Sequence, residues 1–382
     1  MDSLVSSLVL HGPRDLRPTR RPLPPPPPHH VQIAVLSTGL CGSDLHYYLH
    51  ARNGAFALQA PLVLGHESAG IITAVGPLVT HLRPGQHVAI EAGIPCGSCE
   101  WCRSSRYNLC EGMRFRSSAK TFPHLDGTMQ TRINHPAKHV HVLPRGVSCE
   151  QGALAEPLSV VLQASRRAGV SRNTRKVLVF GAGTIGMLAA GLARSRGVPV
   201  EAIAMVDINQ QRLAFAKSRG LVGKIFCLTP QAPAKGVDGL ERSRAQAEVF
   251  GGGYDVVYEC TGAEPCIQMA VYNAKSGGKV LLIGMGTSNA LIPISNAATR
   301  EVDIIGSFRY ADTYKEALEL LASSKHSHIH DVYSIPPIMD LVTHRVPFNV
   351  DAVKKAFEAM AKGKDEKGQL VIKIIIDSES LT

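Results

Sequence analysis

A glycine-rich segment between two apolar runs leaves few folds open to this chain of 382 residues. The run Val177–Phe180 is apolar throughout, as a strand buried on both faces of a sheet requires. It leads into a Gly-x-Gly-x-x-Gly segment at residues 181–186, and apolar residues at helical spacing continue to Gly197. A second apolar run, Ala202–Val206, ends at Asp207. This order of strand, glycine turn, helix, strand and acid predicts an α/β fold with a doubly wound parallel sheet.

The three glycines have distinct expected roles in binding a dinucleotide. Gly181 permits the tight turn, Gly183 lets the backbone approach a diphosphate, and Gly186 allows close packing of helix and strand. Free N–H groups and the helix dipole favour negative charge at the start of the helix. Asp207 lies 26 residues after Gly181, near the offset of roughly 20 expected for an acid that binds the ribose 2′-OH. Because this carboxylate would repel a 2′-phosphate, the segment predicts NAD rather than NADP.

Four of the nine cysteines lie close together in the sequence, with the spacing Cys-x2-Cys-x2-Cys-x7-Cys. Four thiolates at this spacing can fill a tetrahedral zinc site completely, which is typical of a structural site. Polar and glycine residues between them do not suit a core of unligated cysteines. The clustering also differs from the evenly spread cysteines of a disulfide framework. The predicted ligands are Cys96, Cys99, Cys102 and Cys110.

A second set of metal-binding side chains is spread over residues 41–67. Cys41 offers a thiolate, His66 an imidazole and Glu67 a carboxylate. Three protein ligands with one open position are typical of a catalytic zinc site. Because Cys41 and His66 are far apart in the sequence, only a folded domain can bring them together.

Composition narrows the class of protein. The length permits two domains with sizeable cores. With 45% hydrophobic and 19% charged residues, the chain reads as an ordinary globular protein. The formal charge of +10 is scattered along the chain and aromatic residues make up only 5%, so we expect a solvated basic surface and no nucleic-acid partner. No apolar run reaches the roughly 18 residues that span a membrane, and no signal peptide is recognised, which favours the cytoplasm.

The first 150 residues favour β structure. Short apolar strands at Val31–Leu36, Gly70–Gly76 and Gln86–Ile90 alternate with glycine or proline turns, which predicts a small, irregular β domain. Before them, Pro24–Pro28 favours the polyproline II conformation. This segment is interpreted as a rigid surface connector after one early strand, with a recognition motif as the alternative.

The second half continues as alternating strands and helices. Expected strands are Asp255–Glu259, Lys279–Ile283 and Val302–Ile305, with helices starting at Glu264 and near Tyr314. The nucleotide-binding unit is then complete, so we expect the last segment to return to the first domain. That segment holds expected strands and a helix at Leu341–Val346, Ala352–Ala361 and Leu370–Ile376.

With these features the chain resembles the zinc-containing medium-chain dehydrogenase/reductase superfamily over essentially its whole length, and within it the polyol dehydrogenases of the sorbitol and xylitol type. The segments that carry the resemblance are Cys41–Tyr47, Leu64–Gly70, Tyr107–Cys110, Glu156–Val160, Glu259–Pro265 and Gly306–Tyr310. The resemblance implies a GroES-like catalytic domain at residues 1–156 and 309–382, with the four-cysteine lobe at 91–115. It implies a Rossmann-type NAD-binding domain at residues 157–308.

The resemblance also implies roles for individual residues. Cys41 and His66 would hold the catalytic zinc with either Glu67 or Glu156 as the carboxylate ligand, Glu156 otherwise acting through a bound water. The catalytic residues would be Ser43, His46 and Glu156, which carry the hydroxyl proton outward. Residues expected to touch the polyol are Tyr47, Phe56, Glu156, Phe308, Arg309 and Tyr310. Residues expected to touch the cofactor are Gly181, Gly183, Ile185, Gly186, Asp207, Ile208, Arg212, Ile283, Gly284, Met285, Ser307, Phe308 and Arg309.

The implied reaction is oxidation of D-sorbitol and xylitol to a 2-ketose with NAD, with one catalytic and one structural zinc. Phe56 and Phe308 favour this over the alternative of an L-arabinitol 4-dehydrogenase. An alternative of another class is a non-catalytic protein that binds zinc and nucleic acid on the same fold. The intact metal and nucleotide motifs disfavour it. A homotetramer is expected by analogy with the family.

Overall fold

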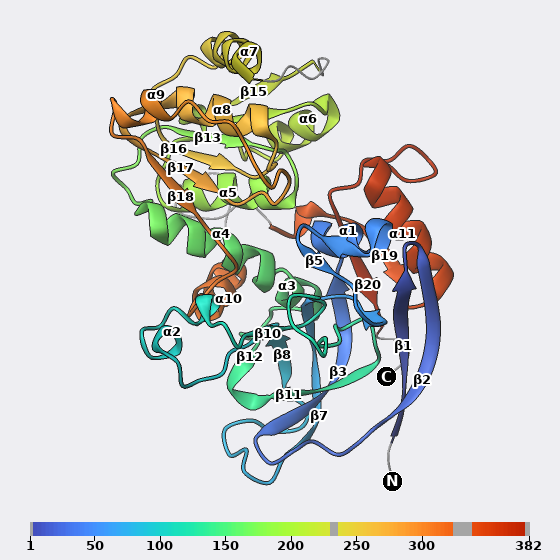
Figure 1. Ribbon diagram of the computed structural model, residues 1–382. Helices are drawn as coiled ribbons and strands as arrows, with labels where there is room; N and C mark the ends of the chain where they lie inside the picture. Colours follow the sequence, from blue (N-terminus) through green and yellow to red (C-terminus); the bar gives the residue numbers. More distant parts are fainter. Residues whose placement is uncertain (1–2, 230–235, 324–337, 379–382) are drawn as a thin grey trace. The chain divides into compact units, whose positions relative to one another are not determined.

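The computed structural model describes residues 3–229, 236–323 and 338–378, and Figure 1 shows its elements. The chain divides into two compact units. Unit 1 comprises Met1–Ser159, Ala311–Ala322 and Leu341–Thr382, and unit 2 comprises Val160–Tyr310 and Ser323–Asp340. The units are defined by packing alone, so the functional boundaries at residues 156 and 309 stay a prediction.

The largest sheet of unit 1 has seven strands in the order β12-β8-β7-β3-β20-β19, and β11 pairs with β3 outside this path. The three strands predicted between residues 31 and 90 are confirmed as β3, β7 and β8. β3 has partners along its length and is buried on both faces, which explains its nearly continuous apolar sequence. The bounds are β3 His30–Gly39, β7 Glu67–Val75, β8 His87–Ile90, β11 Arg132–Pro136, β12 Val140–Val142, β19 Val342–Pro347 and β20 Lys373–Asp377.

The chain begins with a hairpin of two strands, β1 (Ser3–Gly12) and β2 (Asp15–Leu23). The prediction of one early strand was therefore incomplete, because the prolines and charges of β2 disfavour a strand when read alone. Within the described residues β2 pairs only with β1, which pairs in turn with β6 (Leu62–Val63). An edge strand tolerates Pro18 and Pro22, since a missing N–H there breaks no ladder.

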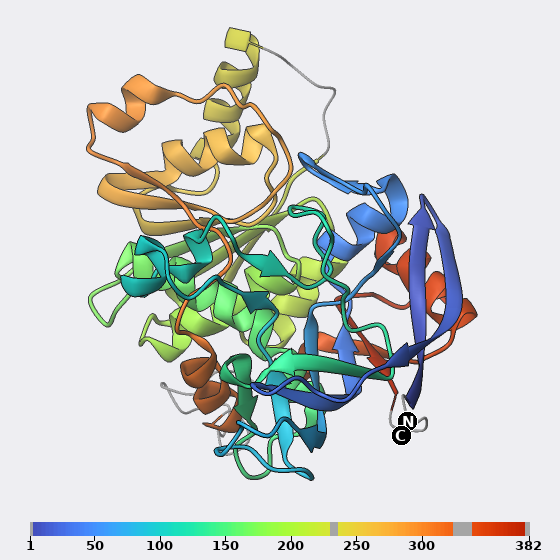
Figure 2. The ribbon, with the colours of Figure 1, turned by 60° about the horizontal axis from the view of Figure 1, so that its bottom comes forward.

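The end of the chain packs within unit 1, as predicted. β20 pairs with β3 and β19 pairs with β20. Helix α11 (Val350–Lys362) starts at Asn349, whose side chain accepts a backbone N–H of the first turn at 2.8 Å. Its Phe357 stacks on Tyr48 with ring centroids 4.4 Å apart, and Figures 1 and 2 show α11 beside the β1–β2 hairpin.

Unit 1 also contains short elements around these sheets. Helix α1 follows β3 directly and carries the start of the predicted metal site. The bounds are α1 Gly42–His50, β4 Arg52–Asn53, β5 Phe56–Ala57, β9 Gly93–Ile94, α2 Glu100–Arg103, η1 Tyr107–Leu109, β10 Arg114–Phe115, η2 Ala137–His139, α3 Cys149–Ala153 and α10 Tyr314–Ser323. The unit boundary falls inside helix α4 (Ala155–Ala168).

Unit 2 is built on a six-stranded parallel sheet in the order β15-β14-β13-β16-β17-β18. This confirms the predicted Rossmann-type fold. Helices α5 and α8 lie on opposite sides of the sheet (Figure 1), and Leu178 and Phe180 of β13 share a buried cluster with α8. The strands are β13 Val177–Phe180, β14 Ile203–Asp207, β15 Lys224–Cys227, β16 Tyr254–Glu259, β17 Ala274–Leu282 and β18 Asp303–Gly306.

The helices of unit 2 follow the predicted alternation. The helices are α5 Thr184–Ser195, η3 Val200–Ala202, α6 Gln210–Ser218, α7 Gly236–Glu248, α8 Glu264–Asn273 and α9 Ile294–Ala298, and η4 Ile338–Leu341 leads back to unit 1. β17 starts five residues earlier than the expected Lys279, beside an irregularity in its register with β16. In the described part of the chain, no helix is long and apolar enough to cross a membrane.

Candidate active site and metal centres

The ends of two neighbouring strands bring the predicted metal ligands together. β3 and β7 are antiparallel, and their register pairs Gly39 with Glu67. Cys41 follows the end of β3, and His66 immediately precedes β7. A Cβ at Gly39 would clash with the Glu67 carboxylate, so a larger residue there would displace the carboxylate from its position beside Cys41 and His66. Pairing of distant strands thus assembles a group that sequence spacing alone could only suggest.

The geometry of this group suits a metal ion. The ligand atoms of Cys41, His66 and Glu67 all lie within 4.8 Å of one another. His66 and Glu67 are buried, whereas Cys41 is half-exposed. A thiolate, an imidazole and a carboxylate are ligands that zinc accepts, and three of them leave a fourth position open. The residues present therefore fit a catalytic zinc.

Asp44 supports this group and was missed by the sequence analysis. Its fully buried carboxylate lies 3.3 Å from Nδ1 of His66 and accepts the N–H groups of Gly65 at 3.1 Å and Cys41 at 3.3 Å. Burial raises the pKa of Asp44, but the His66 ring and the donors from Ser117 and Gly65 lower it below its usual value. A carboxylate on the second ring nitrogen orients a metal-binding histidine. Asp44 is the third residue of α1 and forms a capping box with Cys41, the N-cap residue. This spacing is the sequence signal that could have revealed it.

Lys373 is a second residue that the sequence analysis missed. At the start of β20 its Nζ lies 2.6 Å from Oε2 of Glu67 and 3.0 Å from the carbonyl oxygen of Leu40. Burial lowers the pKa of Lys373, but the negative charges of Glu67, Cys41 and Glu156 raise it above its usual value. The ammonium therefore stays charged and holds one oxygen of Glu67. A lone lysine in the apolar run at 371–376 is the sequence signal of such a buried pair.

The other predicted catalytic residues lie at different depths. Ser43 Oγ is 3.3 Å from Cys41 Sγ and 3.5 Å from His66 Nε2. His46 is exposed on α1, with its ring centroid 6.3 Å from that of His50. Glu156 is buried in the first turn of α4 and contributes to the field on Lys373, but it does not belong to the 4.8 Å group.

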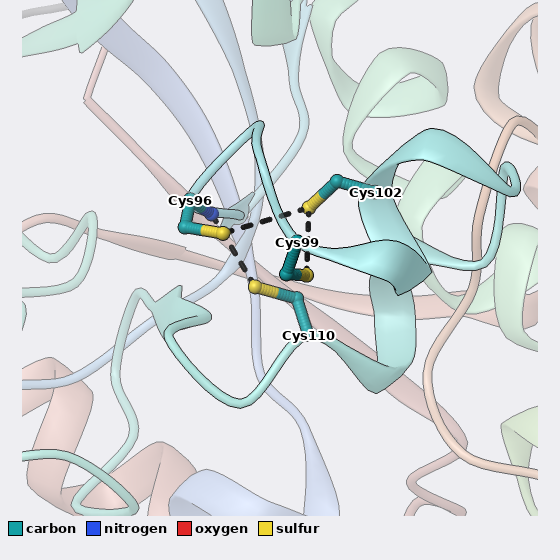
Figure 3. Close-up of side chains that lie close together, drawn as sticks. All are labelled: Cys96, Cys99, Cys102 and Cys110. Carbon is teal, nitrogen blue, oxygen red and sulfur yellow. Dashed lines mark hydrogen bonds between the residues drawn. The ribbon is translucent and has the colours of Figure 1, made fainter.

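The four clustered cysteines form a second metal-binding group. The sulfur atoms of Cys96, Cys99, Cys102 and Cys110 lie within 4.8 Å of one another, and Figure 3 shows them converging on one point. All four are free rather than paired in disulfides. Backbone N–H groups of Ser98 and Cys99 lower the pKa of Cys96 to about 6, which favours the thiolate. This donor set fits a closed, structural zinc site.

A buried carboxylate ties the cysteine lobe to the rest of unit 1. Glu91 accepts hydrogen bonds from the Tyr107 hydroxyl and from Nε2 of His141, both at 2.7 Å. The same Tyr107 oxygen accepts the N–H of Asp312 at 2.8 Å. Burial raises the pKa of Glu91, but hydrogen bonds from His139, His141 and Tyr107 lower it to about 2. Glu91 therefore stays ionised and anchors the lobe.

In unit 2, the glycine segment has the geometry of a diphosphate site. Gly181 has φ of +99°, and a Cβ at Gly186 would clash with the carbonyl oxygen of Gly181. Gly183 is the N-cap of α5, and a Cβ there would have no atom within 4 Å. Open space in front of free helix N–H groups fits a bound diphosphate. The residues present therefore fit a nicotinamide dinucleotide.

The Asp207 carboxylate is hydrogen-bonded to the glycine turn. Its carboxylate accepts the N–H of Ala182 at 2.6 Å and that of Asn209 at 2.8 Å. It ends β14, and the other predicted cofactor residues also lie at the carboxyl ends of strands of this parallel sheet, where dinucleotides bind. These are Ile185, Ile208 and Arg212 near β13 and β14, Ile283, Gly284 and Met285 after β17, and Ser307, Phe308 and Arg309 after β18.

Glu259, which ends β16 and lies in one of the segments that carry the family resemblance, also shapes this edge of the sheet. Its carboxylate accepts the backbone N–H groups of Thr261 and Gly262, each at 2.9 Å. A Cβ at Gly284 would clash with the turn that Glu259 holds. The loops after β16 and β17 thus pack against each other without space for larger side chains.

The predicted substrate residues have varied surroundings. Tyr47 is a core residue with 1% exposure, and its oxygen accepts the N–H of Ala119 at 2.9 Å. Phe56 in β5 packs against the same core. In unit 2, the Arg309 guanidinium lies 4.7 Å from the Phe308 ring centroid, and Tyr310 is buried. Their contacts with a substrate stay predictions.

Two protein families match the chain. Residues 27–145 match the alcohol dehydrogenase GroES-like domain, a range that includes both metal-binding groups. Residues 184–323 match the zinc-binding dehydrogenase family.

Curated relatives and solved structures agree with these matches. The chain is 41% identical over 359 residues to a sorbitol dehydrogenase of Bos taurus and 42% identical over 359 residues to one of Macaca fascicularis. Each match covers 94% of this chain and 93% of the relative. Among solved structures, L-idonate 5-dehydrogenase from Escherichia coli is similar with a TM-score of 0.81 and 26% identity, over 99% of both chains.

Proposed function

The chain belongs to the zinc-containing medium-chain dehydrogenase/reductase superfamily, in its polyol dehydrogenase branch, and we propose that it oxidises D-sorbitol and xylitol to the corresponding 2-ketose with NAD⁺. The observation that carries the proposal is the group Cys41, His66 and Glu67 in a chain about two-fifths identical to sorbitol dehydrogenases. Because the enzyme class is established by the family, the alternative of a non-catalytic zinc and nucleic-acid protein is set aside.

In this proposal the enzyme uses zinc and a nicotinamide dinucleotide, which the match to the zinc-binding dehydrogenase family and the two metal-binding groups support. When bound, zinc polarises the substrate hydroxyl and lowers its pKa, while the nicotinamide accepts the hydride. Cys41, His66 and Glu67 would hold the catalytic metal, with Asp44 orienting the histidine and Lys373 restraining the carboxylate. The four cysteines at 96–110 would hold the structural zinc.

The residues around the metal group supply a proton path in the proposal. Ser43 has its hydroxyl within 3.5 Å of the side chains of Cys41 and His66. We propose that it relays the proton of the substrate hydroxyl: its oxygen accepts that proton while its own proton passes outward toward His46. His46, exposed on the same helix, can pass it to solvent. Glu156 is a buried carboxylate that can accept the proton through water. Tyr47, Phe56, Phe308, Arg309 and Tyr310 are proposed to line the polyol site.

The preference for NAD is proposed from the carboxylate at the end of β14. Asp207 is held by the N–H groups of Ala182 and Asn209, so its negative charge is fixed beside the glycine turn. A fixed carboxylate accepts hydrogen bonds from the ribose hydroxyls and repels a 2′-phosphate.

The homotetramer and the cytoplasmic location stay predictions as well.

Steady-state kinetics of the zinc-loaded enzyme test the substrate assignment. D-sorbitol, xylitol and L-arabinitol are each oxidised with NAD and with NADP. We expect the highest kcat/KM with sorbitol or xylitol and NAD, no turnover for His66→Ala, and unchanged turnover for the exposed control His81→Ala. A kcat/KM for L-arabinitol well above that for sorbitol would instead identify an L-arabinitol 4-dehydrogenase.

A further inference from the structure

The segment Pro24–Pro28 takes no part in the proposed metal or cofactor sites, and four of its five prolines are exposed. Consecutive prolines favour polyproline II, which has three residues per turn. Leu23 and Pro26, three residues apart, are half-buried, whereas the four other prolines of the segment are exposed. The stretch between β2 and β3 therefore exposes most of its prolines, and it ends in a turn at Pro28 and His29, where the His30 N–H donates to the Pro27 carbonyl at 2.9 Å. The exposed prolines are Pro24, Pro25, Pro27 and Pro28.

Backbone contacts hold this segment in place. The Asn134 side chain donates to the carbonyl of Pro24 at 2.9 Å, and the Leu78 N–H donates to that of Pro28 at 3.0 Å. A Cβ at Gly76 would clash with the carbonyl of Pro27, so the end of β7 packs closely against the segment. A partner would therefore meet a preordered surface and would not bear the entropy cost of ordering a free peptide.

Positive charge lies at the start of the segment. Arg20 is exposed at the end of β2 and forms no ion pair with any residue that the structure describes. Its neighbour Arg21 is half-buried and pairs with Asp126 at 2.8 Å, while Arg17 pairs with Asp15 at 2.7 Å. Among the three arginines of β2, Arg20 is therefore the one without an ion pair to any described residue.

We propose that residues 20–28 are a docking site for a protein module of the SH3 type, whose aromatic-lined polyproline groove has an acidic border. Such grooves bind prolines spaced as Pro-x-x-Pro along a polyproline II helix. Pro24 and Pro27, both exposed and both before the turn at Pro28, form such a pair. Arg20 meets the acidic border of the groove. The site is separate from the polyol dehydrogenase machinery and does not depend on the proposed substrate.

Direct binding to the full-length chain tests the proposal. Purified SH3 domains with acidic groove borders, together with WW domains, are titrated against the immobilised protein by biolayer interferometry. We expect at least one SH3 domain to bind and Pro24→Ala/Pro27→Ala to weaken it by about tenfold or more. Arg20→Glu is expected to weaken it by roughly 3- to 10-fold, more so at low salt, whereas Arg20→Lys keeps most of the affinity.

Matched controls separate docking from folding. Pro18→Ala removes an exposed proline of β2 outside the segment and is expected to bind as the parent does. Pro25→Ala alters an exposed proline between the two members of the pair and is expected to weaken binding less than the double variant does. Thermal unfolding of every variant shows whether the fold is kept. If no SH3 domain binds, if only WW domains bind, or if folded Pro24→Ala/Pro27→Ala binds like the parent, the proposal is wrong.

Discussion

Lys373 and Glu67 form a buried ion pair with Nζ and Oε2 2.6 Å apart, and their side chains are 3% and 2% exposed. The ammonium also donates to the carbonyl of Leu40 at 3.0 Å. It thus fixes one oxygen of a predicted zinc ligand and neutralises the carboxylate before any metal binds. Desolvation makes a buried pair costly, so its presence at this position favours a role in orienting Glu67.

Replacing Lys373 with methionine should destabilise the metal-free protein by about 3–5 kcal/mol, because Glu67 keeps a buried charge without its partner. Zinc supplies positive charge to the same carboxylate, so the loss should be smaller when the metal is bound. Urea unfolding with zinc and with a chelator measures both values.

The control Lys373→Arg retains the charge and should lose less stability than the methionine variant. Equal stability of the parent and Lys373→Met in the presence of chelator would contradict this account of the pair.

The sequence predicted the elements that local patterns encode. The strand and glycine turn at residues 177–186 were recognised because three local features indicate the same fold. These are the apolar run of the strand, the placement of the glycines and the helical spacing of the apolar residues that follow. The metal ligands were recognised from residue type and motif. Asp44, Lys373 and Glu91 were missed because their partners lie on distant segments. The capping position of Asp44 and the lone lysine in the apolar run at 371–376 are local signals, but neither identifies the partner of the buried charge. β2 was missed because the edge position that tolerates its prolines is a property of the sheet.

Asp44 is expected to set the zinc affinity of the catalytic group. Asp44→Asn removes the charge beside Nδ1 of His66, and loss of such a partner typically lowers metal affinity or activity by about 10- to 100-fold. Zinc titration and kcat measure the effect. The control Ser117→Ala removes only one neutral donor to the same carboxylate and should change zinc affinity less. Equal zinc affinity of Asp44→Asn and the parent would show that the carboxylate does not orient the ligand.

Loss of the structural zinc should leave the catalytic zinc in place. Cys102→Ser removes one of four thiolates from the closed site, so the purified protein should lose one zinc per chain and unfold at a lower temperature. The catalytic zinc should remain, since Cys41, His66 and Glu67 are untouched. Elemental analysis counts the metal, and exposed Cys227→Ser is the matched control, expected to keep two zincs. Retention of two zincs by Cys102→Ser would argue against the four-thiolate site.

Cofactor preference should respond to the carboxylate at the end of β14. Asp207→Ser with Ile208→Arg removes the repulsion of a 2′-phosphate and adds a cation at an exposed position. The ratio of kcat/KM for NADP to that for NAD should rise by about tenfold or more, since each 1.4 kcal/mol is a factor of ten. Asp207→Asn alone removes only the charge and should give a smaller change. An unchanged ratio in the double variant would show that Asp207 does not select the cofactor.

Glu91 should make stability sensitive to acid. Its pKa is lowered from 4.5 to about 2, so its contribution is present above the unfolded-state pKa near 4.5 and is lost as the pH falls toward 2. Glu91→Gln abolishes this contribution at every pH. The gap in unfolding free energy between parent and variant, measured in urea with a chelator, should therefore narrow by about 1 kcal/mol between pH 7 and pH 3.5. A gap that stays constant or widens would mean that Glu91 is not held ionised by Tyr107 and the histidines. The variant should also loosen the cysteine lobe, because a neutral amide accepts the Tyr107 hydroxyl less strongly than a carboxylate does.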